Sequence, residues 1–309
     1  MSVGNHQRQA ALAAALKAIT DDEPLSTEHH DALSCLEGTD VQAFREVWTT
    51  LPAGARARLI RTLHSAAENR LRLDYSNLNH LALEDADAKV RVAAIQAGLE
   101  DRSPRLLEGL LELLRHDPSS AVRRAAAEDL SRFALLGELE DLDPDSTARV
   151  REALVSKVRD NGEEPGVRSS ALAALGYFSD PATAHELAAS FGNPALRLGA
   201  VRGMGRNADP RWTDRLMPVL GSDDPQMRLE AARALGEIED ERAVRPLSEL
   251  VDDSERDVRL AVIRALGDIG GEQARESLLY LLEDSDPEVR AAAEEAIGNL
   301  EFYEDPLGL

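Results

Sequence analysis

Arginines recur at one position of a repeated sequence pattern, and they are the side chains of this chain best suited to bind an anion. A guanidinium group can hold a phosphate or a carboxylate through two parallel hydrogen bonds. Acidic residues such as Asp223, Asp252 and Asp284 lie between the repeats and offer each arginine a partner within the chain. Because every repeat carries one such arginine, we expect it to help stack the repeats. The seven arginines are Arg91, Arg123, Arg168, Arg197, Arg228, Arg259 and Arg290.

Residues that could carry out catalysis or hold a metal are scattered along the chain. Cys35 is the only cysteine, and the nearby His29 and His30 form no defined nucleophile–base pair with it, so we expect a buried, unreactive thiol. The one His-Glu pair, His185-Glu186, provides too few ligands for a metal site. The sequence contains no G-x-S-x-G motif and no phosphate-binding glycine-rich loop. We therefore predict no catalytic, cofactor-binding or metal-binding residues and a protein that is not an enzyme.

The net charge narrows the possible partners. The 309 residues include 57 acidic and 35 basic side chains, which gives a formal net charge of −22 at pH 7. Such a surface repels nucleic-acid phosphates and anionic lipid headgroups, so we expect neither as a partner. The N-terminal segment lacks a basic stretch before an apolar one, and no run of about 18 apolar residues occurs. With a single cysteine, these features predict a cytoplasmic protein whose partner is another protein or a peptide segment.

The arginines lie on helical hairpins that repeat along the chain. From residue 197 to residue 290, consecutive arginines of the set are 31 residues apart, a period typical of stacked helical hairpins. The tracts Pro225–Ile238 and Arg256–Ile269 share the same pattern, with Arg-Leu and Arg-Ala-Leu-Gly at matching positions, and a second apolar, helix-like stretch follows each of them, from Ala243 and from Ala274. One interval is longer: the 45 residues from Arg123 to the next arginine indicate an insertion near 137–146, which we expect to be a lengthened loop before a helix at 147–159.

Two further positions of the repeat have a physical explanation. Acidic, amide or, at Ser119, hydroxyl residues stand four positions before the arginines and are often followed by proline, as in Asp224-Pro225, which is typical of a helix N-cap and first turn. Glycine stands eight positions after five of the arginines. We expect these glycines near the end of the first helix, where they let the chain turn into the second helix. They are Gly176, Gly205, Gly236, Gly267 and Gly298.

This pattern resembles the HEAT-like repeat, in the short form found in phycobilisome lyase subunits and many bacterial proteins. The tract Pro287–Gly298 matches that form closely, as do Met227–Ile238 and Val258–Ile269. The resemblance implies an all-α fold, a right-handed α-solenoid of HEAT-like helical hairpins. We expect an irregular helical N-terminal cap at 1–85, about seven repeats at 86–300 and a C-terminal tail at 301–309.

The resemblance also supplies functional alternatives. HEAT-like iron enzymes that hydroxylate deoxyhypusine carry His-Glu pairs in the first helices of their repeats, and the matching positions here hold no histidine, as at Val92-Ala93 and Leu229-Glu230. Lyase subunits of this class hold an open-chain tetrapyrrole, but no residue here marks a chromophore site. We predict a non-catalytic scaffold or adaptor for protein–protein interaction without a cofactor. The alternatives are an accessory subunit of a bilin lyase-type enzyme and a degenerate relative of the iron hydroxylases.

The predicted binding surface is the concave face of the solenoid, which we expect the second helices to line. Their outward positions change from repeat to repeat, as a recognition groove requires. A locally basic cluster is the best candidate to anchor an acidic or extended segment of a partner, because arginine and tryptophan are enriched at binding hot spots. This cluster consists of Arg211, Trp212, Arg215, Arg242 and Arg245. The predicted partner-binding residues are Arg211, Trp212, Arg215, Arg242, Arg245, Glu249, Gln273, Glu276 and Tyr280.

Overall fold

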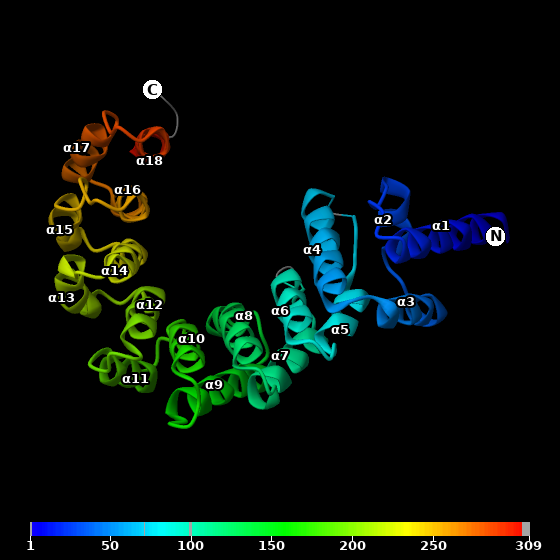
Figure 1. The fold of residues 1–309 in the computed structure, drawn as a ribbon. Coiled ribbons are helices and arrows are strands. Elements are labelled where there is room, and N and C mark those ends of the chain that lie inside the picture. Colours follow the sequence, from blue (N-terminus) through cyan, green and yellow to red (C-terminus); the bar gives the residue numbers. More distant parts are fainter. Residues whose placement is uncertain (1, 71, 99–100, 305–309) are drawn as a thin grey trace. The chain divides into compact units, whose positions relative to one another are not determined.

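The computed structural model describes residues 2–70, 72–98 and 101–304. Within those ranges every regular element is an α-helix or a short 3-10 helix, which confirms the predicted α-solenoid (Figure 1). The chain divides into two compact units, Met1–Phe133 and Ala134–Leu309. This division falls inside helix α8 (Ser120–Glu138). The predicted border between cap and repeats, at residues 85 and 86, comes from the sequence pattern and stays a prediction.

The first unit is helical over the segment predicted as the N-terminal cap, which contains α1 to α5, and further stacked helices follow. Helix α1 packs against α2 and α3, and α4 packs against α6. The core is apolar: Leu33, Phe44, Leu63 and Leu78 are each at most 2% exposed. The helices are α1 (Ser2–Thr20), α2 (Thr27–Leu33), α3 (Gly38–Thr50), α4 (Ala53–Asn69), α5 (Ser76–Leu83), α6 (Ala88–Ala97), α7 (Pro104–His116) and the first part of α8.

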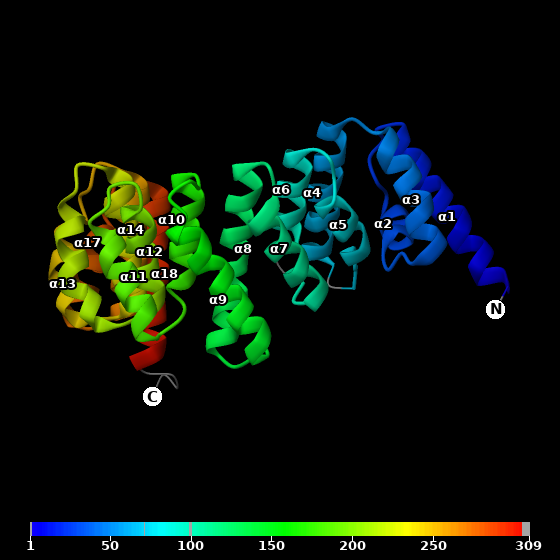
Figure 2. The same cartoon turned by 90° about the horizontal axis from the view of Figure 1, so that it is seen from below.

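The second unit is built of two rows of helices (Figures 1 and 2). We call the row on its concave side the inner row and the row on its convex side the outer row. The inner row bends, and the outer row covers it from outside. The inner row consists of α10 (Pro165–Leu175), α12 (Arg197–Asn207), α14 (Pro225–Ile238), α16 (Arg256–Ile269) and α18 (Pro287–Glu304). The outer row consists of α11 (Pro181–Phe191), α13 (Thr213–Leu216), α15 (Val244–Ser248) and α17 (Glu272–Leu281), and α9 (Pro144–Arg159) precedes both rows.

Glycines allow the inner helices to approach closely. A Cβ atom at Gly176 would lie 2.2 Å from the backbone oxygen of Gly203, and one at Gly205 would lie 2.7 Å from Cα of Ala234. Neighbouring inner helices therefore meet backbone to backbone, which shortens the inner row and favours the observed bend. The prediction that these glycines serve the turn was wrong for α12: Gly205 lies inside the helix, and the left-handed residue is Ala208, with φ of 52°.

Several helix starts follow the predicted capping pattern, but α12 begins later, at Arg197, without a side-chain cap, and Glu255 makes no side-chain cap at α16. The carboxylate of Asp224 accepts a hydrogen bond from the backbone N–H of Gln226 at 2.9 Å, and Pro225 occupies the first position of α14, where a missing N–H does no harm. Asp87 caps α6 in the same way, and Glu164 caps α10. Local sequence therefore determines where these helices begin.

The insertion predicted near 137–146 mainly lengthens two helices, so its assignment to a long loop was wrong. Helix α8 continues to Glu138 and α9 begins at Pro144, and only residues 139–143 separate them. The carboxylate of Asp143 caps α9 by accepting from the backbone N–H of Ser146 at 2.9 Å. The extra residues are thus mostly absorbed as additional helical turns.

Prolines limit two helices of the outer row. Helix α13 ends at Leu216, because Pro218 has no N–H to continue the helical bonds. Helix α15 begins at Val244, because Pro246 cannot bond the carbonyl oxygen of Arg242, and residues 241–243 form a 3-10 turn instead. The stretch from Ala243 is helical as predicted, but its α-helix is short.

Candidate functional site

The predicted arginine set links adjacent repeats. Nη1 of Arg228 donates to the backbone oxygen of Ser222 at 2.9 Å, while Nε and Nη2 donate to the carboxylate of Asp253 at 2.7 and 2.9 Å. Asp253 belongs to the turn of the next repeat, and its backbone oxygen accepts from Arg259 at 2.8 Å. The arginine of one repeat thus forms hydrogen bonds both with the turn of its own repeat and with the turn of the next repeat.

Arg91 makes the most buried version of this link and is 8% exposed. Its Nε and Nη2 donate to the carboxylate of Asp117 at 2.7 and 2.8 Å, and its Nη1 donates to the backbone oxygen of Asp85 at 2.7 Å. Removing one member of a buried pair of this kind leaves the charge of the other without compensation, which is strongly destabilising. The same bonds recur, wholly or in part, at Arg123, Arg259 and Arg290.

Two members of the set differ from this pattern. Arg168 donates to the backbone oxygen of Val158 at 3.0 Å. The guanidinium of Arg197 lies 5.0 Å from the centre of the Phe191 ring. Since most of the arginines are engaged with turns and carboxylates of their own chain, the set does not form a continuous anion-binding surface.

The basic cluster predicted to bind a partner is largely occupied by the protein itself. Trp212 is 3% exposed and its Nε1–H donates to Asn207 at 2.8 Å, so its assignment to a contact surface was wrong. The guanidinium groups of Arg211 and Arg215 lie 5.9 and 5.8 Å from the centre of its ring. Arg211 also donates to the carboxylate of Asp209 at 2.6 Å, which compensates its charge.

The other predicted binding residues are exposed but lie on the convex side. Arg245 and Glu249 are exposed at α15 and its end, and Gln273 and Glu276 are exposed on α17. Tyr280, also on α17, is 58% exposed. The prediction that these residues line the concave face was wrong, because the helices that carry them form the outer row (Figure 1). That they contact a partner stays a prediction.

Asp240 connects two outer helices through ionic hydrogen bonds. Its carboxylate accepts from Nε of Arg242 at 2.9 Å and from the hydroxyl of the fully buried Thr213 at 2.8 Å. Arg242, which also bonds Asp214 at 2.9 Å, is the main reason that the pKa of Asp240 falls to about 2. The charge of Arg242, a member of the predicted cluster, is thereby compensated.

We expect Asp240→Asn to lower the melting temperature at pH 7 and to change it little at pH 2. The folded-state pKa of Asp240 lies below the unfolded value of about 4, so the ionised carboxylate stabilises the fold above that pH. This contribution is lost as the pH falls through about 2. Thermal unfolding followed by circular dichroism at both pH values measures the difference. Asp214→Asn, which removes an exposed partner of the same arginine, should have a smaller effect, and equal effects of the two variants would contradict the assignment.

A row of side chains that sequence reasoning missed lies directly after the glycines, on the inner helices or, at Tyr177, just beyond the end of α10. The guanidinium of Arg206 lies 5.2 Å from the centre of the Tyr177 ring. A carboxylate oxygen of Glu237 lies over Gly205, 2.6 Å from where a Cβ atom would stand, and Asp268 lies over the next glycine in a similar way. The register itself could have revealed this row, because its members follow the glycines by one residue. They are Tyr177, Arg206, Glu237, Asp268 and Asn299, and we call them the inner-face row.

The two acids of the inner-face row lack a bonded cation. In the part of the chain that the structure describes, neither Glu237 nor Asp268 forms a hydrogen bond or ion pair. Withdrawal from water raises the pKa of both carboxyl groups, and the nearby Arg206 and Arg264 oppose that rise only in part. A cation bound from outside would therefore stabilise these carboxylates.

A cleft of about 1080 Å³ opens on the same face between α16 and α18. Its lining includes Asp268, Glu295, Ile263 and Ala292, which combine carboxylates with apolar side chains. The inner helices are less tightly packed here: the atoms nearest to a Cβ atom at Gly267 would be Cβ and Cα of Ala296, at 3.3 and 3.9 Å. The concave face thus contains a hollow at its C-terminal end.

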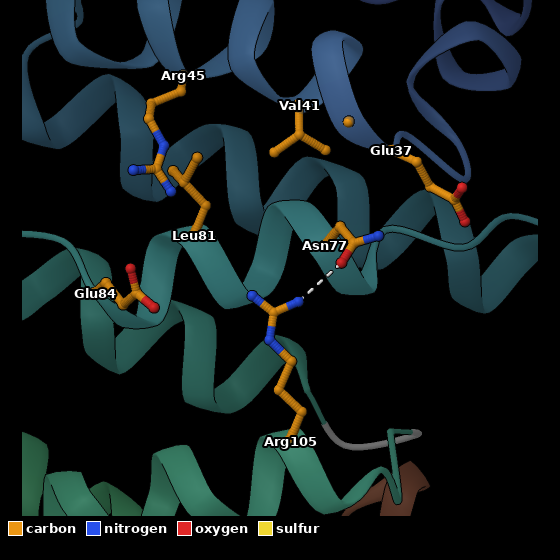
Figure 3. A pocket seen from close by; sticks show the side chains of 8 residues that line it. Glu37, Val41, Arg45, Asn77, Leu81, Glu84 and Arg105 are labelled. Carbon is orange, nitrogen blue, oxygen red and sulfur yellow. Dashed lines mark hydrogen bonds between the residues drawn. The ribbon is translucent and has the colours of Figure 1, made fainter.

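A smaller cleft of about 370 Å³ lies in the first unit, among α3, α5 and α7. Figure 3 shows the guanidinium groups of Arg45 and Arg105 on either side of Leu81, and Arg105 donates to the side-chain oxygen of Asn77 at 3.0 Å. Glu37 and Glu84 line the same cleft. Because positive and negative charges balance there, the cleft does not favour either kind of ion.

The structure offers little to support chemistry. Among the described residues, no three His, Cys, Asp or Glu side chains come together as ligands for a metal ion. Cys35 is exposed, which contradicts the expected burial, and its sulfur lies 3.6 Å from the hydroxyl oxygen of Ser34. Glu186 of the His-Glu pair accepts from Nε of Arg159 at 2.7 Å. No helix within the described ranges has the length and apolar character needed to cross a membrane.

Comparison with known proteins agrees with this geometry. The sequence pattern of HEAT repeats matches residues 77–161, 185–259 and 246–306, which together make up more than half of the chain. The chain belongs to the HEAT-repeat family. No curated protein matches it significantly. The HEAT-repeat match begins at residue 77, within α5, so it reaches into the segment predicted as the cap.

Solved structures share the repeat architecture at low identity. The complex of CpcE and CpcF of phycocyanin lyase from Nostoc is 16% identical, with 72% of this chain and 94% of that chain covered and a TM-score of 0.49. Human deoxyhypusine hydroxylase is 18% identical, with 73% and 95% covered and a TM-score of 0.33. The YibA protein of Escherichia coli is 15% identical, with 96% and 97% covered and a TM-score of 0.41. At these values the likeness concerns the fold alone.

Proposed function

We propose that this HEAT-repeat protein is a non-catalytic scaffold that binds a segment of a partner protein along the inner row of its second unit. The inner-face row supports the proposal: it presents one side chain per repeat, in register, and the residue type changes at every step. Residues that stack a solenoid stay constant from repeat to repeat, whereas residues that recognise an extended partner must vary. The acids Glu237 and Asp268, which have no bonded cation among the described residues, provide the unsatisfied charge that a partner would compensate.

The inner row can be tested against the outer row with two variants that leave the net charge unchanged. Arg206→Glu with Glu237→Lys exchanges charges on the inner-face row, and Arg245→Glu with Glu249→Lys does the same among the predicted partner-binding residues of the outer row. Partners are captured from the native host with the wild-type chain and identified by mass spectrometry. We expect the inner variant to capture at least tenfold less of these partners than the wild-type chain, and the outer variant to capture as much as the wild-type chain. The opposite result would return the binding surface to the outer row, and retention by both variants would refute both surfaces.

A non-catalytic scaffold should also contain no stoichiometric cofactor. We expect the protein purified from its native host to contain less than one iron per ten chains by elemental analysis, because its His-Glu pair is isolated and Glu186 is engaged with Arg159. The protein should also show no visible absorbance from a bound tetrapyrrole. Iron near one atom per chain, or a bilin absorbance band, would favour one of the enzymatic alternatives instead.

A further inference from the structure

The cleft between α16 and α18 has an apolar floor. Ile263 and Leu300 are 2% and 7% exposed, and Leu260, Ala292 and Ala296 complete a surface without polar side-chain atoms. With a volume of about 1080 Å³, the cleft is large enough for several side chains of a bound segment. An apolar surface of this kind gains free energy when another apolar surface removes it from water.

The rim of the cleft is predominantly acidic. Glu239, Asp268, Glu288 and Glu295 line it, and Arg264 is the one basic side chain among the lining residues. Glu288 forms an ion pair at 3.0 Å with Arg256, a residue that does not line the cleft. The carboxylates of Glu239, Asp268 and Glu295 have no ion pair within the described residues. The excess of negative charge around an apolar floor therefore favours an occupant that is apolar on one side and basic at its edges.

We infer that this cleft binds a basic amphipathic segment of the partner protein, with its apolar side chains on the floor and its lysines or arginines against the acidic rim. This inference deepens the proposed function and rests on it. The raised pKa of Asp268 agrees with the inference, because burial and the neighbouring Glu239 disfavour its charge until a cation arrives. A basic segment lying across α16 and α18 would reach Asp268 of the inner-face row, so the cleft continues the surface proposed above.

The chain's own C-terminal residues fit the cleft less well by charge. Residues 305–309 read Asp-Pro-Leu-Gly-Leu, and they would add an acidic side chain and no basic one to a rim that is already acidic. Like charges brought together in this way repel one another. The partner is therefore the favoured occupant, and deletion of residues 305–309 should leave its affinity unchanged.

The experiment uses the full-length protein and a synthetic amphipathic helix with leucines on one face and lysines on the other. Binding is measured by isothermal titration calorimetry at physiological ionic strength, and a peptide with glutamates in place of the lysines serves as the comparison. We expect the lysine peptide to bind and the glutamate peptide not to bind. Asp268→Lys with Glu295→Lys should lower the affinity for the lysine peptide at least tenfold. Ala292→Trp, which fills the cleft above its floor without changing the charge, should lower that affinity to a similar extent. Circular dichroism checks that both variants remain folded.

The matched control separates this site from general attraction to an acidic protein. Glu249→Lys with Glu276→Lys changes the net charge by the same amount on the outer row, and it should leave the affinity within about twofold. An equal loss in this control, or unchanged binding by Ala292→Trp, would overturn the inference. Tighter binding after deletion of residues 305–309 would do so too, because it would identify the chain's own tail as the occupant. If the native partner still depends on Arg206 and Glu237 in that case, the proposed function stands without this cleft.

Discussion

Gly176→Ala should destabilise the second unit by at least about 2 kcal/mol, because overpacking that meets backbone cannot relax cheaply. The added Cβ atom would stand 2.2 Å from the backbone oxygen and 2.5 Å from Cα of Gly203. Both atoms belong to the next inner helix, so the two helices would have to separate. Urea unfolding followed by circular dichroism measures the change in the free energy of unfolding.

Gly298→Ala is the matched control for this substitution. Gly298 occupies the same repeat position in α18, the last inner helix, and nothing lies within 4 Å of a Cβ atom placed there. Alanine is the better helix former, so this variant should be neutral or more stable by up to about 1 kcal/mol. If both variants were destabilised alike, the glycine position would serve the local backbone conformation and not the contact between repeats.

Arg91→Ala should destabilise the first unit by about 3–5 kcal/mol, the range expected when one partner of a buried ion pair is removed. The substitution leaves the carboxylate of Asp117, a residue that is only 7% exposed, without its cation. It also removes the bond to the backbone oxygen of Asp85, which positions the turn before α6. Chemical unfolding of the full-length chain, followed by far-UV circular dichroism, reports this loss.

Arg197→Ala provides the control within the same arginine set. Arg197 is exposed and its recorded contact is with the ring of Phe191, so its removal should cost at most about 1 kcal/mol. A double-mutant cycle with Asp117→Asn isolates the pair: if Arg91 acts through Asp117, the two substitutions together should cost clearly less than their sum. Additive effects would show that the arginine stabilises the fold through its backbone contacts alone.

The two predictions concern the same property of a solenoid, the link between each repeat and the next. The glycines set how closely the inner helices pack, and the arginines connect consecutive turns. Because the inner helices stay in register, the inner-face row repeats at a regular interval along the concave face. A partner segment that spans several repeats depends on that interval, so loss of packing at one repeat should also weaken binding at its neighbours.

Much of the fold could be predicted from local pattern. The period of 31 residues, the N-cap acids and the prolines at first helical positions depend on residues close together in sequence, and they correctly indicated stacked hairpins. The insertion near 137–146 was assigned the wrong structure, because composition alone did not show that α8 would continue to Glu138.

The sequence by itself determined the repeat, the all-α class and the positions of many helix ends, because backbone bonding and capping act over a few residues. Only the tertiary structure decided which row of helices is concave, since the bend depends on how closely backbones of different repeats can approach, as at Gly176 and Gly203. It also buried Trp212 and paired Arg242 with Asp240, contacts between side chains that the repeat period does not specify. The candidate binding surface consequently lies on the inner helices, beside the glycines that bring them together.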